Sequence, residues 1–126
     1  MRILLDTHVL LWWLADDRLL PERAAAAIAD AATEVAVSAA TAWEIAIKQA
    51  AGRLAAPHDL LDALAANDFE TLAITVPHAI VAAHLPAHHA DPFDRMLIAQ
   101  AQAGGLTLVT VDRRFSDYDV DLLPLG

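Results

Sequence analysis

The stretch RILLDTHVLLWWLA, residues 2–15, decides the fold class of this chain. Residues 2–5 form a short apolar run behind a single arginine, which is typical of a buried strand. Residues 7–15 are apolar on nearly every side, as a central helix would be. Asp6 stands between the two segments. A strand that ends in a carboxylate and runs straight into a helix places that carboxylate at one edge of a sheet.

The rest of the chain repeats this alternation of strand and helix. We expect strands over residues 35–38, 71–75 and 107–111, a last short strand near 120–122, and helices over 21–32, 41–51, 58–68, 77–84 and 92–103. Strands that alternate with helices indicate a parallel sheet with helices on both faces. The predicted fold class is therefore α/β, a three-layer α/β/α sandwich with a mainly parallel central sheet. The length predicts one domain, residues 1–126, because domains typically run to roughly 100–150 residues.

Four acids stand at the ends of apolar segments, namely Asp6, Glu44, Asp94 and Asp112. In a parallel sheet such positions converge at one edge, where open α/β sheets bind their ligands. Converging carboxylates repel one another unless a hard divalent cation neutralises them, and carboxylate oxygens are the ligands that Mg²⁺ and Mn²⁺ prefer. The pattern indicates a metal-dependent phosphoryl-transfer enzyme.

Each acid also has an explanation in local structure alone. Asp6 and Asp112 are suitable N-caps for the segments that follow them. Glu44 stands three residues after a threonine, which is the spacing of a capping box. Asp91 is a natural N-cap, and Asp94 would then complement the dipole of the first helical turn. A cap contributes only about 1 kcal/mol, and Ser, Thr or Asn would serve. Acids at all four places therefore favour the metal site.

Basic residues adjoin the acids. Lys48 follows Glu44 by one helical turn, so it either forms an ordinary ion pair worth about 0.3–0.5 kcal/mol or contacts a phosphate at the rim of the acidic cleft. Arg95, Arg113 and Arg114 stand beside two of the acids. They are either contacts to a nucleic-acid backbone or solvated counter-charges.

Histidine and tryptophan residues leave further alternatives open. His88 and His89 are either metal ligands or proton shuttles, or, more commonly for histidines in a loop, exposed spacers. Trp12, Trp13 and Trp43 fall within helical patterns, so we expect them in the core or an interface rather than stacked on bases.

Composition limits the remaining classes. The formal net charge of −9 has the wrong sign for a protein that grips nucleic acid by its overall field, although a few local cations suffice for a nuclease. The absence of cysteine excludes disulfides and thiolate metal sites and suits a reducing cytoplasm. The 57% apolar content favours a dimer or a partner interface, and we expect no membrane span.

Four motifs in order carry a resemblance to a known family. They are LLDTH at 4–8 with Leu11 and Trp12, SAATAWEIAIK at 38–48 followed by GRL at 52–54, HHADPFDRMLIAQA at 88–101, and LVTVD at 108–112 with Phe115 and Tyr118. Together they resemble PIN-domain proteins, specifically the VapC-type toxins, over nearly the whole chain.

The resemblance implies a Mg²⁺- or Mn²⁺-dependent endoribonuclease that is the toxin of a bacterial type II toxin–antitoxin pair. The acidic quartet of that family matches Asp6, Glu44, Asp94 and Asp112, which would be both metal ligands and catalytic residues, with Thr7, Thr110 and Asp91 as accessory residues. The implied partners are an RNA substrate such as tRNA or rRNA, a cognate antitoxin and a second copy in a homodimer. Arg113 and Arg114 follow Asp112 with no further acid nearby, so a possible fifth ligand, and with it the choice between one metal ion and two, stays open.

The predicted mechanism is hydrolysis by a metal-activated water in line with the leaving oxygen. It predicts 5′-phosphate and 3′-hydroxyl products. Two alternatives stay open from the residues. A phosphatase that uses Asp6 as nucleophile is disfavoured, because the position two residues later is His8 and not a second acid. A non-catalytic PIN-like module that binds RNA or protein is disfavoured by the intact quartet.

Overall fold

The structure is a computed structural model that describes residues 1–126. Four strands form one sheet in the order β3-β2-β1-β4, and every pairing in it is parallel. The strands are β1 (Arg2–Leu5), β2 (Glu34–Ser38), β3 (Glu70–Leu72) and β4 (Thr107–Val109). The helices are α1 (Thr7–Leu14), α2 (Glu22–Ala29), α3 (Ala39–Ala50), α4 (Leu60–Ala66), α5 (Val76–His84) and α6 (Pro92–Gly104), and a 3₁₀ turn, η1, spans Arg113–Asp117. None of the helices has the length and apolar composition needed to cross a membrane.

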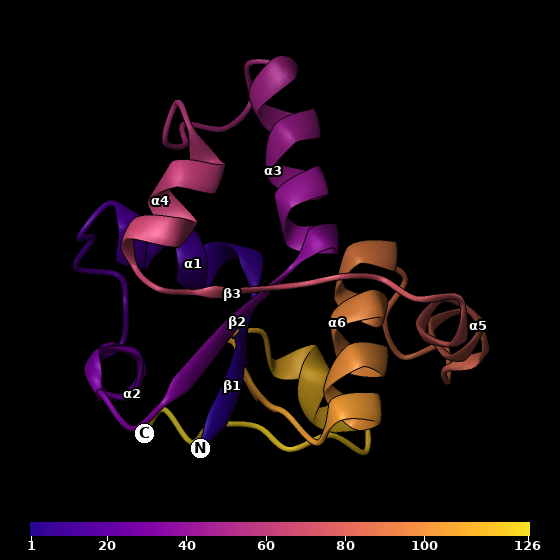
Figure 1. The fold of residues 1–126 in the computed structure, drawn as a ribbon. Helices are drawn as coiled ribbons and strands as arrows, with labels where there is room; N and C mark the ends of the chain where they lie inside the picture. The colour runs from indigo at the N-terminus through magenta and orange to yellow at the C-terminus, as the bar shows by residue number, and fades with distance from the viewer.

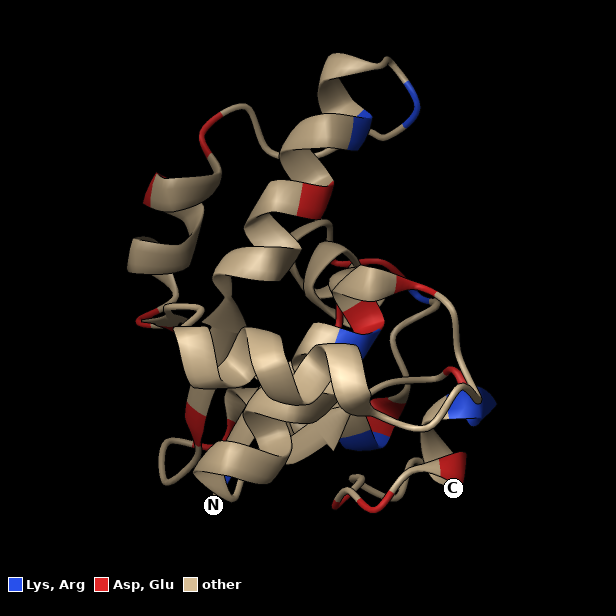
Figure 2. Ribbon diagram, turned by 90° about the vertical axis from the view of Figure 1, so that its right-hand side faces the viewer, with Lys and Arg blue, Asp and Glu red and all other residues tan.

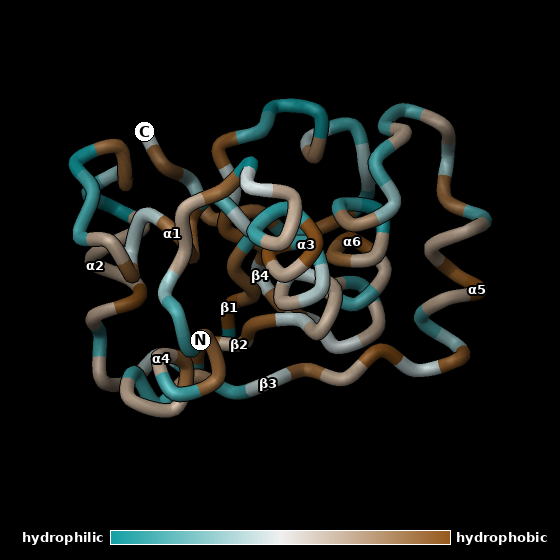
Figure 3. The backbone as a smooth tube through the Cα atoms, turned by 90° about the horizontal axis from the view of Figure 1, so that it is seen from above, coloured by the Kyte–Doolittle hydropathy of each residue, from teal (hydrophilic) through white to brown (hydrophobic).

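Successive residues of β1 supply the two faces of the sheet. Ile3 and Leu5 belong to one buried cluster, which includes side chains of α1, α2, α3 and α4. Leu4 belongs to a second cluster with side chains of α6 and with Phe115 of η1. This alternation is the period of two that a strand imposes, and it confirms the predicted α/β/α sandwich. Figures 1 and 3 show the strands in the middle of the molecule and α5 at its periphery, beyond α6.

The start of α3 differs from the expected one. The helix begins at Ala39, because Ser38 at the end of β2 caps it by accepting a hydrogen bond from the Ala40 N–H. Thr41 and Glu44 therefore lie inside the helix, and the capping-box interpretation of Glu44 is wrong. The side chain of Glu44 is therefore not used to cap the helix.

Other boundaries shift by a few residues. The helix expected over 21–32 ends at Ala29, since Asp30 is extended and binds the Ala32 N–H. The expected strand near 120–122 is reduced to one parallel bridge between Leu122 and Leu108. The strand expected over 107–111 ends at Val109, and Thr110 and Val111 continue beyond it to Asp112.

Candidate metal centre

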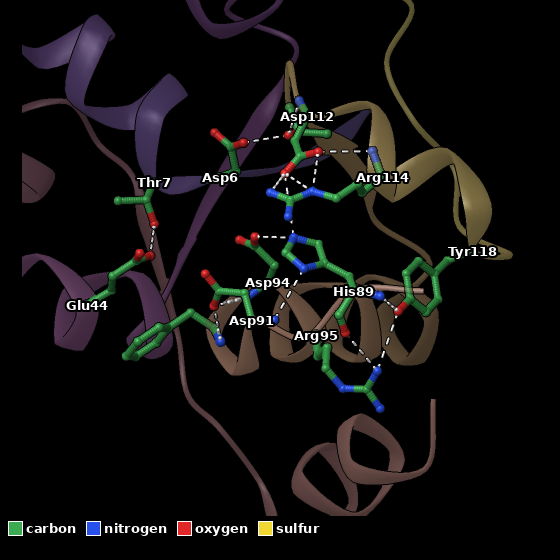
Figure 4. A network of polar contacts seen from close by, with 12 residues as sticks. Asp6, Thr7, Glu44, His89, Asp91, Asp94, Arg95, Asp112, Arg114 and Tyr118 are labelled. Atoms are coloured by element: carbon green, nitrogen blue, oxygen red, sulfur yellow. Dashed lines mark hydrogen bonds and ion pairs between the residues drawn. The ribbon is translucent and has the colours of Figure 1, made fainter. Parts of the chain in front are cut away.

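The carboxyl ends of β1, β2 and β4 lie at one edge of the sheet, and the segments that follow them bring the predicted acids together. Figure 4 shows Asp6, Asp94 and Asp112 around a common space, with Glu44 to one side. Asp6 follows β1, Glu44 lies on α3, Asp94 lies in the first turn of α6, and Asp112 precedes η1. The convergence expected from the sequence is present in the structure.

Asp6 is buried, with 5% of its surface exposed. One carboxylate oxygen caps α1 by accepting the Val9 N–H at 2.8 Å, and the other accepts the Thr110 hydroxyl at 2.5 Å. Burial raises the pKa of Asp6 above its ordinary value, although these two hydrogen bonds act in the opposite direction. The capping role and the site role therefore coexist in one side chain.

Glu44 is held by two neighbours. Its Oε1 accepts the Thr7 hydroxyl at 2.6 Å, which links α3 to the first residue of α1. Its Oε2 lies 2.6 Å from Nζ of Lys48, one helical turn further on. Thr7 thus contacts one of the four acids, and Lys48 forms the ion pair. Figure 2 shows the acidic and basic positions close together along the ribbon of α3.

Asp94 lies near several other negative charges. Burial raises its pKa from 3.8 to about 6, and the negative charges of Asp91, Asp6 and Glu44 add to the effect, whereas His89 acts the other way. Asp91 caps α6 through the Phe93 N–H at 2.9 Å and the Asp94 N–H at 3.4 Å. The acids of three different chain segments are therefore near enough to disfavour one another's charge.

Asp112 is the most exposed of the four acids, and its carboxylate is paired with an arginine. Arg114 binds both of its oxygens through Nε at 3.1 and 3.2 Å, and Nη2 lies 2.8 Å from Oδ2. These hydrogen bonds lower the pKa of Asp112. Its own N–H donates to the Thr110 hydroxyl at 3.0 Å, so Thr110 joins Asp112 to Asp6.

His89 is buried, so the expectation of an exposed spacer is wrong for this residue; His88 is exposed. The His89 N–H donates to the hydroxyl of Tyr118 at 2.9 Å, and the ring packs edge-on against Phe115. Nε2 lies 2.7 Å from Oδ2 of Asp94 and 3.5 Å from Oδ2 of Asp112. The sequence offered one signal for this position, a histidine just ahead of the Asp91 cap of α6.

The arginines divide into three situations. Arg95 turns away from the acids, and its guanidinium donates to the carbonyls of Pro86, Leu85 and His89, among others. It ties the loop before α6 to α5, so the structure gives it a structural role in place of the predicted phosphate contact. Arg114 is the counter-charge of Asp112, whereas Arg113 is exposed and forms no ion pair.

The donor set fits a hard divalent cation. Lys48 and Arg114 each pair with one acid, which leaves Asp6 and Asp94 without a basic partner of fixed charge. Both of these unpaired acids have a raised pKa. His89, Asp94 and Asp112 each offer a possible ligand atom, and the three atoms lie within 4.8 Å of one another. Carboxylate oxygens that repel one another in this way are suited to Mg²⁺ or Mn²⁺.

Comparison with known proteins assigns the family. A sequence model of the PIN domain matches residues 3–121. This chain belongs to the PIN-domain family. Over 119 residues, 92% of this chain and 91% of the other, it is 36% identical to Ribonuclease VapC22 of Mycobacterium tuberculosis (strain ATCC 25618 / H37Rv). The resemblance to VapC-type PIN proteins that the four motifs indicated is confirmed.

Solved structures agree on the fold. A chain of a toxin–antitoxin complex from Klebsiella pneumoniae matches with a TM-score of 0.70 and 20% identity, over 97% of each chain. A chain of VapBC2 from Rickettsia felis, bound to a DNA fragment from the promoter, matches with a TM-score of 0.68 and 14% identity, over 98% of each chain. At these identities the likeness supports the PIN fold.

Proposed function

We propose that this PIN domain is a Mg²⁺- or Mn²⁺-dependent endoribonuclease and the toxin of a type II toxin–antitoxin pair. The observation that carries the proposal is the convergence of Asp6, Glu44, Asp94 and Asp112 at one sheet edge, with two of them left without a lysine or arginine partner. The 36% identity to a protein named Ribonuclease VapC22 supports the choice of RNA as substrate.

Asp6, Asp94 and Asp112 would hold the cation directly or through waters, since Mg²⁺ usually keeps several waters. Glu44 would hold a second ion or orient the attacking water. A bound divalent ion supplies charge neutralisation at the phosphoryl oxygens and lowers the pKa of a coordinated water. The chain's own residues hold these groups in place: Thr110 and the Val9 N–H fix Asp6.

Local cations would bring the RNA backbone to this acidic edge. Lys48 and Arg114 lie beside the acids, and Arg113 is exposed next to them. Each would contact a phosphate on the strand that enters the site. Such contacts are needed because the formal net charge of −9 repels RNA over the rest of the surface.

A cognate antitoxin is the proposed protein partner, and a homodimer is the proposed assembly. The support is that similar folds come from toxin–antitoxin complexes. An arginine or lysine of the antitoxin inserted among the four acids would be a natural inhibitor, because it would compete with the cation. A complex with the acidic edge open to water would contradict that mode of inhibition.

The test is cleavage of a mixed pool of total RNA and tRNA by the purified protein, with Mg²⁺, Mn²⁺ or EDTA. We expect cleavage that requires the metal, leaves 5′-phosphate and 3′-hydroxyl ends, and is lost in Asp6→Asn. Asp59→Asn is a matched control, because Asp59 also caps a helix, α4, but is itself exposed. Products with 2′,3′-cyclic phosphate, or metal-independent cleavage, would contradict the mechanism. A folded protein without any cleavage would favour the non-catalytic module.

A further inference from the structure

His89 has contacts that its place in the sequence did not suggest. It is 4% exposed, although it lies in the loop between α5 and α6. Its backbone N–H, its ring face and both ring nitrogens all have fixed neighbours. The N–H is bound by Tyr118, and the ring packs against Phe115. A buried imidazole held on every side points in one defined direction, and Figure 4 shows that direction to be toward Asp94.

The Nδ1 atom of this ring decides which nitrogen carries the proton. It accepts the backbone N–H of Asp91 at 3.2 Å. A nitrogen that accepts a hydrogen bond has its lone pair directed at the donor and carries no hydrogen. The proton of the imidazole is therefore on Nε2, the nitrogen that faces the acids.

The Nε2 atom lies between two carboxylates. It is 2.7 Å from Oδ2 of Asp94 and 3.5 Å from Oδ2 of Asp112, and it is buried without a well-directed hydrogen bond to either oxygen. An N–H in this position has both oxygens as its nearest acceptors. Metal-binding histidines instead donate the proton of their other nitrogen to an acceptor, whereas here the other nitrogen faces an N–H.

We propose that His89 is a positioning residue whose Nε2–H bridges Asp94 and Asp112 and holds both carboxylates in place for the cation. It does not bind the ion itself. The inference rests on the proposed metal site and adds a residue to it. The bridge joins an acid of α6 to the acid that follows β4, two elements that Thr110 does not connect. The backbone N–H of Asp91 donates to Nδ1 of His89, so the residue that caps α6 also sets the orientation of the ring.

Three substitutions test whether Mn²⁺ binding depends on the Nε2–H donor of His89 or on other contacts of its ring. His89→Gln keeps an N–H donor at the position of Nε2. His89→Asn keeps an acceptor for the Asp91 N–H but has no donor at that distance, and His89→Leu has neither. We expect Mn²⁺ binding, measured by calorimetry without RNA, to weaken about tenfold or more in His89→Asn and His89→Leu, which is the range for outer-shell partners. His89→Gln is expected to stay within about threefold of the wild type.

The proton position is measured on the wild-type protein, which avoids any variant that fails to fold. In protein labelled with ¹⁵N at histidine, the protonated and bare nitrogens of His89 are distinguished by shift, and the signals are assigned by their loss in His89→Gln. We expect the proton on Nε2 both before and after saturation with Mg²⁺. A proton that moves to Nδ1 when Mg²⁺ binds would show that His89 is a ligand and would overturn the proposal.

The remaining outcomes are also decisive. Unchanged Mn²⁺ affinity in all three variants, or a loss in His89→Gln as large as in His89→Asn, would overturn the positioning role while the metal site stands. A folded wild-type protein that binds neither ion would overturn the metal site and this role together. Circular dichroism and thermal melting of each variant establish that the comparison is made between folded proteins.

Discussion

The four acids of this PIN domain form two unlike pairs. Glu44 and Asp112 each have a basic partner, Lys48 at 2.6 Å and Arg114 at 2.8 Å. Asp6 and Asp94 have no lysine or arginine partner, and burial raises the pKa of both. The first pair is electrostatically satisfied by the protein, and the second is not. Under the proposed function, a cation would be needed most beside Asp6 and Asp94, and Glu44 and Asp112 would be further ligands or neighbours of the ion.

The largest effect is expected from Asp94→Asn. The substitution removes a proposed ligand, so Mn²⁺ affinity should fall on the order of 100-fold or more, beyond the loss typical of outer-shell changes. The metal-free protein should at the same time become more stable by about 1–2 kcal/mol at pH 7, because a charge that burial disfavours has been removed. Calorimetry measures the first effect and urea unfolding in EDTA the second. If the variant and the wild type were equally stable in EDTA, the claim that Asp94 destabilises the metal-free protein would be contradicted.

The pH dependence of stability in EDTA should show the same contrast. The folded-state pKa of Asp94 is raised from 3.8 to about 6, so the folded protein binds more protons than the unfolded chain between these values. Its free energy of unfolding should therefore fall as the pH rises from about 4 to about 6, by roughly 1–2 kcal/mol. Asp112 has a lowered pKa, so its contribution to the free energy of unfolding is present above the ordinary pKa of an aspartate. That contribution is lost only as the pH falls below this ordinary pKa.

Unfolding by urea at a series of pH values measures this slope, with Asp94→Asn as the control. The slope should be smaller in the variant, and the part that remains belongs to Asp6, whose pKa is raised as well. A stability that rises over this interval in EDTA would contradict the raised pKa. Added Mg²⁺ should reverse the trend, because the ion competes with protons for the same oxygens.

A smaller effect is expected from Arg114→Gln. The guanidinium that holds Asp112 is exposed, and exposed ion pairs are weak, so its removal should tighten Mn²⁺ binding by only roughly two- to fivefold. Arg113→Gln is the matched control, since it removes the same charge one position away from a side chain without an ion pair. If both variants change the Mn²⁺ affinity equally, general charge and not the pairing of Asp112 is responsible.

The smallest effect is expected from Thr7→Val. Oε1 of Glu44 loses its hydroxyl donor while Lys48 keeps Oε2, so the free energy of unfolding should fall by about 1 kcal/mol with little change in Mn²⁺ affinity. Thr41→Val on the neighbouring helix is the control, because the Thr41 hydroxyl is buried without a partner. That variant should be neutral or slightly stabilising in thermal melting. Equal losses in both variants would contradict the role of the Thr7–Glu44 bond.

Much of the site was predictable because its acids are placed by local structure. Asp6 follows an apolar strand and caps the next helix, so the capping interpretation drawn from the sequence is confirmed, and the same position brings its carboxylate to the edge of the sheet. Asp91 likewise caps α6 and places Asp94 in the first turn. The expected site rests on these short-range rules and on the parallel sheet, and both are visible in the pattern of apolar segments.

What could not be predicted depends on contacts between distant parts of the chain. The burial of His89 requires Tyr118, which is 29 positions further along. Arg95 is engaged by carbonyls of the loop before α6 and of α5, a geometry that no spacing in the sequence shows. Trp43, expected in the core or an interface, is 62% exposed and packs edge-on against Phe93 of α6. The sequence did not show in which direction these side chains point, and that direction decides their contacts.

The most direct test of the unlike pairs is a crystal of the protein soaked in Mn²⁺ and measured for its anomalous signal. We predict a peak within coordination distance, about 2.0–2.3 Å, of carboxylate oxygens of both Asp6 and Asp94, with Nε2 of His89 outside that distance. A peak held only by Glu44 and Asp112, or no peak at a saturating Mn²⁺ concentration, would contradict the account.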